Sequence, residues 1–190
     1  MIRGQVGAKL LGCSVLLAAS LSNAFAAELP TRKPGLWEMK MVRTGSQMPD
    51  MTMQHCTDET TDKDLNNMVS PMAKQICSKQ DVQKTPTGYV VDSVCNMRGV
   101  NTASHAEITG DFNSAYTVKT TSHSEGVSNV VRDTSLAKVL RDTTMTIEAK
   151  WLGACKPGQK PGDIVMPGGG FKLNVKDMDK LKALIPGAKQ

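Results

Sequence analysis

The chain has 190 residues and a formal net charge of +5, from 23 Lys and Arg against 18 Asp and Glu. This length fits a single domain that is large enough for a hydrophobic core. The modest charge, with no Lys/Arg cluster interleaved with aromatic side chains, argues against a nucleic-acid-binding protein.

The first 26 residues have the order of a secretory signal peptide. Arg3 and Lys9 form the positive start, an apolar run covers residues 10–21, and residues 24–26 (AFA) offer a cleavage site. The run is too short to cross a bilayer, which takes roughly 20 residues. The sequence therefore predicts cleavage after Ala26, a periplasmic location and no transmembrane segment in the mature chain. A lipoprotein cleavage box before Cys13 is the less favoured alternative, because the apolar run continues beyond it.

Four cysteines remain after the signal, at Cys56, Cys77, Cys95 and Cys155. An even number in an exported chain predicts two disulfides. None belongs to a C-x-x-C pair, which argues against a thioredoxin-like motif and against the usual structural zinc spacing.

In chain order, residues 28–35 form an extended lead-in, and alternation predicts strands at 36–42 and 51–55. Residues 57–75 place apolar side chains three and four apart, which predicts a short helix, kinked or ended near Pro71. Further strands are predicted at residues 77–84, 89–97, 103–109, 115–122 and 143–152.

Short strands separated by turns predict a mainly β fold, either an antiparallel sandwich or an open barrel, with a short helical insert. Five glycines and three prolines between residues 156 and 170 predict a linker, followed by a short helix near 174–184. The predicted organisation is a signal peptide at 1–26, a disulfide-stapled β domain at 27–155, and a Pro/Gly-rich linker with a C-terminal tail at 156–190.

The strand faces also predict the disulfide pairing. Cys95 shares a face with Tyr89 and Val91, and Cys155 continues the alternation of the 143–152 strand. Both would point into one core, which predicts a Cys95–Cys155 bridge and leaves Cys56 to pair with Cys77 across the helical insert.

Catalytic motifs are lacking: there is no G-x-S-x-G, no H-E-x-x-H and no phosphate-binding glycine loop. His105 and Glu107 would share one strand face and could act as an acid/base pair, but such pairs are common on solvated sheet faces. We predict a non-enzymatic protein without a cofactor.

Met48, Met51, Met53 and His55 suggest an alternative, because thioether and imidazole groups are ligands that Cu(I) prefers. The competing interpretation is that these methionines pack in the core as adaptable fillers. Ligands in steps of two along a strand lie about 7 Å apart, so packing is preferred over a copper site.

Two short motifs carry a family resemblance: KPGLWE at residues 33–38 and WLGAC at residues 151–155. With these motifs the chain resembles the exported proteobacterial proteins grouped as domain-of-unknown-function family 3617, over about residues 33–155. The resemblance implies a periplasmic, cysteine-containing domain with no assigned activity and no catalytic residues to carry over. Together with the absent motifs, it predicts a binding or accessory protein of the cell envelope, with an envelope protein or an apolar ligand as its partner.

Overall fold

The computed structural model of the protein describes residues 28–44, 49–168 and 172–177. The strands are β1 (Gly35–Thr44), β2 (Met51–Thr57), β3 (Cys77–Thr85), β4 (Gly88–Met97), β5 (Val100–Asp111), β6 (Ala115–Glu125), β7 (Asp142–Gly153), β8 (Asp163–Val165) and β9 (Lys172–Asn174). The helices are α1 (Glu59–Ile76), α2 (Val127–Val130), α3 (Thr134–Arg141) and the 3-10 turn η1 (Val175–Asp177).

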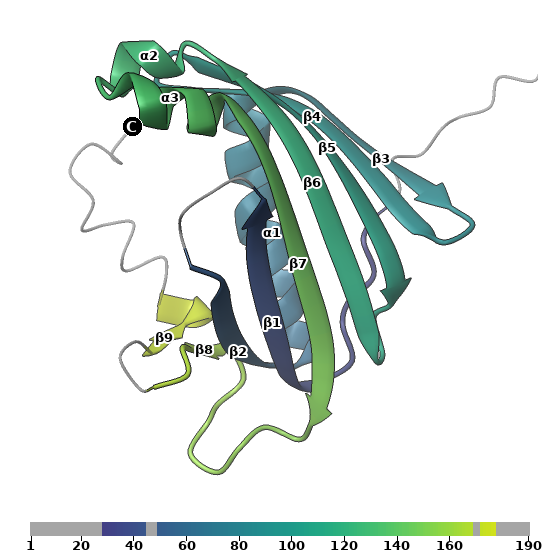
Figure 1. Ribbon diagram of the computed structural model, residues 1–190. Coiled ribbons are helices and arrows are strands. Elements are labelled where there is room, and N and C mark those ends of the chain that lie inside the picture. Colours follow the sequence, from purple (N-terminus) through teal and green to yellow (C-terminus); the bar gives the residue numbers. More distant parts are fainter. Residues whose placement is uncertain (1–27, 45–48, 169–171, 178–190) are drawn as a thin grey trace, which may run out of the picture.

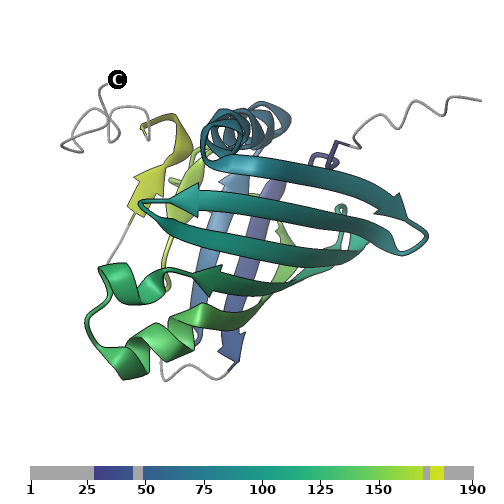
Figure 2. The same ribbon diagram turned by 90° about the horizontal axis from the view of Figure 1, so that it is seen from above.

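All nine strands belong to one sheet in the order β3-β4-β5-β6-β7-β1-β2-β8-β9. Every pairing is antiparallel, and β3 and β9 are the two ends, so the sheet is not closed. The predicted mainly β class is confirmed. Figures 1 and 2 show that the long sheet curls, with β1 and β2 crossing behind the layer made by β3 to β7.

Helix α1 lies between the two ends of this open sheet. It contacts β3 and β4 at one end and η1, which follows β9, at the other. Its start is fixed by a capping box, in which the Asp58 carboxylate accepts from the Thr61 backbone N–H and the Thr61 hydroxyl accepts from the Asp58 N–H. The helix does not end at Pro71 but continues to Ile76.

Two helices were not predicted. Helices α2 and α3 follow β6 and precede β7 in the chain. They contact each other and lie at the end of the sheet where β4 turns into β5 (Figure 1). The signal for α3 is present in the sequence, because Asp133 caps the backbone N–H groups of Ser135 and Leu136.

The predicted linker after Cys155 is wrong for residues 163–165, which form β8 and pair with β2. In the described part of the predicted 174–184 helix, Asn174 ends β9 and residues 175–177 form the 3-10 turn η1. The segment beyond residue 177, the signal peptide with Cys13, and Met48 lie outside the described residues. The described helices include none that is long and apolar enough to cross a membrane.

The predicted disulfide pairing is wrong. Cys56 pairs with Cys155, and Cys77 pairs with Cys95. Cys77 and Cys95 are direct partners in the β3–β4 register. Cys155 cannot follow the alternation of β7, because that strand ends at Gly153, whose φ of 115° turns the chain out of the extended conformation.

One face of the sheet, here called the inner face, looks toward α1. An aromatic cluster lies near the start of β1 and β6, with Tyr116 between Trp37 and Phe112 at centroid distances of 5.5 and 4.7 Å. Farther along, the middle of the inner face is apolar but incompletely covered, and a row of serine and threonine side chains follows toward α2. Seven of its side chains remain half-buried: Met39, Met41, Met53, Val91, Val118, Met145 and Ile147.

Candidate functional site

The two family motifs meet at the filled end of the inner face. Trp37 and Trp151 are direct partners across β1 and β7. Their indole N–H groups donate to the carbonyls of Lys33 and Pro34, at 2.8 and 3.1 Å. Gly35 is required here, because a Cβ would lie 2.3 Å from the Gly153 carbonyl oxygen. The motifs therefore hold the lead-in segment against the sheet.

This anchored lead-in buries a charged cluster under α1. Arg32 is 7% exposed and Asp62 is 4% exposed. The Asp62 carboxylate accepts from the Arg32 backbone N–H and from its Nε, both at 2.8 Å. A second guanidinium nitrogen donates to Nδ1 of His55 at 3.0 Å. The positive charge is thus paired, as burial in a low-dielectric environment requires.

His55 is fully buried, and the hydrogen bond from Arg32 determines its tautomer. Because the guanidinium can only donate, Nδ1 is the acceptor and the proton of the neutral ring is on Nε2. That Nε2 group has no hydrogen-bond partner among the described residues. Burial, and then the Arg32 charge, lower the pKa of His55 from 6.5 to about 4.

This shift predicts a loss of stability in mild acid. The unfolded chain binds the His55 proton near pH 6.5 and the folded chain only near pH 4, so stability falls as the pH decreases through that interval. Wild type should lose about 2 to 3 kcal/mol more than His55→Gln between pH 7 and pH 4. Urea unfolding of both proteins at several pH values measures the difference. Parallel pH profiles would contradict it.

The four candidate copper ligands differ in their surroundings. Met51 is 39% exposed and His55 is fully buried, while Met53 is half-buried beside Met39 on β1. To bind a metal, His55 would have to give up either its hydrogen bond to Arg32 or its Nε2 proton. No group of three His, Cys, Asp or Glu side chains in the described segments is arranged to hold a metal. The copper site stays a prediction.

A cavity of about 530 Å³ lies at the opposite end of the inner face, beside the end of α1. Its walls are mostly apolar and come from α1, β4, β5 and the α2 region: Ile76, Cys95, Met97, Val100, Thr102, Val130 and Val131, with Arg98 also lining it. Cys95 and Thr102 are direct partners in the β4–β5 register, as are Val91 and Ala106. Each lies four residues from its counterpart along the strand, so all four side chains share the inner face. The volume falls in the range of small-molecule pockets, and the exposed Met97 and Val130 leave the cavity open to solvent.

Arg98 at this cavity has an unusual backbone. It occupies the first position of the two-residue turn between β4 and β5, with a φ of 52°, followed by Gly99 with a φ of 83°. Such turns favour Asn, Asp or Gly, because a side chain in the left-handed region costs about 1 kcal/mol. No carboxylate pairs with Arg98 in the described structure. A strained, unpaired cation beside an apolar cavity is the kind of outlier that marks a functional site.

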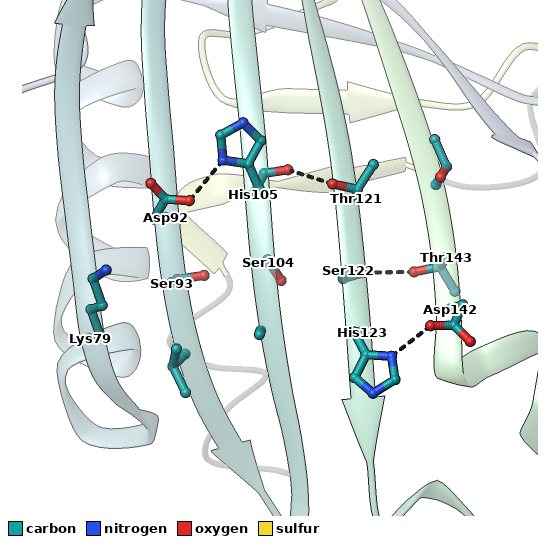
Figure 3. A pocket seen from close by; sticks show the side chains of 13 residues that line it. Lys79, Asp92, Ser93, Ser104, His105, Thr121, Ser122, His123, Asp142 and Thr143 are labelled. Carbon is teal, nitrogen blue, oxygen red and sulfur yellow. Dashed lines mark hydrogen bonds and ion pairs between the residues drawn. The ribbon is translucent and has the colours of Figure 1, made fainter.

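The outer face carries a second hollow, of about 540 Å³, with two imidazole–carboxylate pairs (Figure 3). His105 Nδ1 lies 2.8 Å from the Asp92 carboxylate, and His123 Nδ1 lies 2.6 Å from that of Asp142. The hydrogen bond to Asp92 is the main reason that the pKa of His105 is raised. Glu107, the predicted partner of His105, is farther away, 3.8 Å from Nε2.

Neither imidazole of this outer hollow is hydrogen-bonded to a side-chain hydroxyl or thiol among the described residues. Nucleophilic catalysis needs such a group hydrogen-bonded to the base. All four paired side chains are more than a third exposed, so water competes with every contact they make. The sequence could have indicated these pairs only through the strand register, which sets Asp92 beside His105 and His123 beside Asp142.

Together, the open antiparallel sheet, its bridging helix and its two disulfides define a small disulfide-stapled β domain with an open apolar hollow near the end of α1. The family model described as "Protein of unknown function (DUF3617)" matches residues 32–155, and the chain belongs to this family. The match begins at the buried Arg32 and ends at Cys155 of the long-range disulfide. No curated protein and no solved structure matches the chain.

Proposed function

We propose that this protein is a non-enzymatic binding protein of the bacterial cell envelope, exported to the periplasm, whose ligand is an amphipathic anion. The apolar chain of the ligand occupies the cavity between α1, β4, β5 and α2, and its acidic group meets Arg98. The observation that carries the proposal is this apolar cavity, which has one unpaired, conformationally strained cation at its edge.

Three further features support this function. Another part of the inner face, on β1, β2 and β7, carries half-buried methionines, which are side chains that adapt to ligands of varied shape. Among the described residues, the outer-face imidazoles are hydrogen-bonded to carboxylates and to no hydroxyl or thiol, an arrangement compatible with a non-enzymatic role. Two disulfides are typical of proteins in oxidising compartments. Export itself is tested by the intact mass of the exported protein, which should begin at Ala27.

Ligand binding is tested with cis-parinaric acid, a fluorescent anionic fatty acid, and its displacement by palmitate. Val100→Trp places a bulky side chain in the cavity wall and should abolish binding. Ala103→Trp puts the same side chain on the exposed outer face of β5 and serves as the matched control. Equal binding by both variants, or none by wild type, would reject the proposed ligand class.

Arg98→Asn separates binding from stability. Asparagine suits the left-handed turn position, so the variant should be more stable than wild type by about 0.5 to 1 kcal/mol. It should also bind palmitate roughly 5- to 10-fold more weakly, since a charge-assisted hydrogen bond is lost, while affinity for hexadecanol stays the same. Thermal unfolding and probe displacement measure the two effects. An unchanged palmitate affinity would remove Arg98 from the site.

A further inference from the structure

Around the mouth of the cavity, the end of the molecule that carries α2 and α3 exposes an unusual amount of apolar surface. Met97 is 57% exposed, Val130 53%, Leu136 45% and Val139 40%. Met97 ends β4 and the other three residues belong to the two short helices, which lie together at the upper end of Figure 1. We call these four side chains the α2–α3 patch. Exposed apolar side chains grouped at one end of a small domain favour an interaction site.

The unpaired charges around the α2–α3 patch are mainly positive. Residues 125–142 contain the cations Arg132, Lys138 and Arg141 and the acids Glu125, Asp133 and Asp142, but Arg141 is paired with Asp142 at 2.8 Å. Arg132 and Lys138 have no ion-pair partner in the part of the chain that the structure describes, whereas Asp133 is occupied in capping α3. With Arg98 beside the cavity, unpaired cations therefore border the exposed apolar side chains.

We propose that the α2–α3 patch docks the protein on an anionic phospholipid membrane. Leu136 and Val139 lie three residues apart on α3, on a face that the sheet does not cover. They enter the boundary between headgroups and acyl chains, as the apolar face of an interfacial helix does. Arg132 and Lys138 meet the acidic headgroups. The apolar cavity then opens toward the bilayer.

Charge complementarity favours a lipid surface over another copy of this chain. A second copy would bring the same cations against each other, whereas an anionic membrane attracts every one of them. The membrane contact uses residues on α3 that do not line the cavity, so it goes beyond the proposed ligand binding and can be tested separately.

Vesicle flotation of the purified, disulfide-intact protein tests the proposal, using phosphatidylglycerol-containing vesicles and pure phosphatidylcholine vesicles. The protein should bind the anionic vesicles, and high salt should weaken binding. Arg132→Gln/Lys138→Gln should reduce binding roughly 25-fold, about 5-fold per charge. Leu136→Gln/Val139→Gln should also reduce it. The control Lys119→Gln/Lys150→Gln, which removes two exposed cations from the outer sheet face, should bind like wild type.

Three results would overturn the proposal. Wild type could fail to bind anionic vesicles, or it could bind through the C-terminal tail, in which case Lys180→Gln/Lys182→Gln/Lys189→Gln would lose binding and the α3 variants would not. In the third case, sedimentation would show that the α2–α3 patch forms a dimer that the α3 variants dissociate. The cavity variant Val100→Trp should still float with vesicles, so failure of the ligand proposal is distinguishable from failure of membrane docking.

Discussion

Replacing Asp62 with alanine should destabilise the protein by about 3 to 5 kcal/mol, because it leaves a buried guanidinium without a counter-charge. The Asp62 carboxylate accepts hydrogen bonds from both the backbone and the side chain of Arg32, and both residues are almost inaccessible to solvent. Without the Asp62 carboxylate, nothing would offset the free-energy cost of keeping the Arg32 charge away from water. Urea unfolding at pH 7 measures the change.

Two comparisons make the Asp62 result specific. Glu59→Ala removes an exposed carboxylate from the same helix, where it pairs with Lys63 at the surface, and should have a far smaller effect. The double variant Arg32→Met/Asp62→Leu should recover much of the lost stability, because apolar replacements remove both buried charges together. A mild effect of Asp62→Ala would show that the pair is solvated.

Removing the Cys56–Cys155 disulfide should cost more than removing the Cys77–Cys95 disulfide. The first bridge closes a sequence separation of 99 residues and the second one of 18. The chain-entropy relation assigns them about 4.7 and about 3 kcal/mol. The long bridge also joins the segment after β7 to β2, two strands away across the sheet, whereas the short one lies within a hairpin that is already paired.

The double variants Cys56→Ala/Cys155→Ala and Cys77→Ala/Cys95→Ala, unfolded in urea, give the comparison. Non-reducing peptide mapping checks the pairing itself. A Cys56–Cys77 linkage, or a greater loss of stability from the short loop, would contradict this account.

The long strands could be predicted from the sequence because apolar and polar side chains alternate along them. In β7, Met145 and Ile147 alternate with Thr144 and Thr146, so the pattern itself marks the strand. The short helices were missed because their apolar periodicity covers only one or two turns, as with Leu136, Val139 and Leu140 in α3. Helix α3 has eight residues, and Leu136 and Val139 stay exposed on it instead of entering a core. Its only clear signal is the Asp133 cap.

Most of the candidate site could not be predicted from the sequence, because contacts between residues far apart in the chain create it. Arg32 lies in a proline-containing lead-in that suggests solvent exposure, and its burial depends on Asp62, 30 residues later. Arg98 and Gly99 do separate two alternating segments, which is compatible with a two-residue turn. The left-handed conformation of Arg98 and the absence of a partner, however, follow only from the folded chain.

The predicted disulfide pairing failed for a related reason. Strand alternation was extended to Cys155, two residues past the glycine that ends β7. Alternation holds only while the backbone remains extended, so it carries no information beyond Gly153. The correct pairing of Cys77 with Cys95 needed the hairpin register, which residue spacing alone left open.

An NMR titration of the methionine methyl groups with dodecanoate tests the central claim most directly. The account predicts saturable shifts at Met97, which lines the cavity, and no shift at Met166, which lies after β8 outside it. The Met97 shifts should disappear in Val100→Trp and persist in Ala103→Trp. If dodecanoate leaves the Met97 signal unchanged, or shifts Met97 and Met166 alike, the cavity is not the site where this protein binds an apolar ligand.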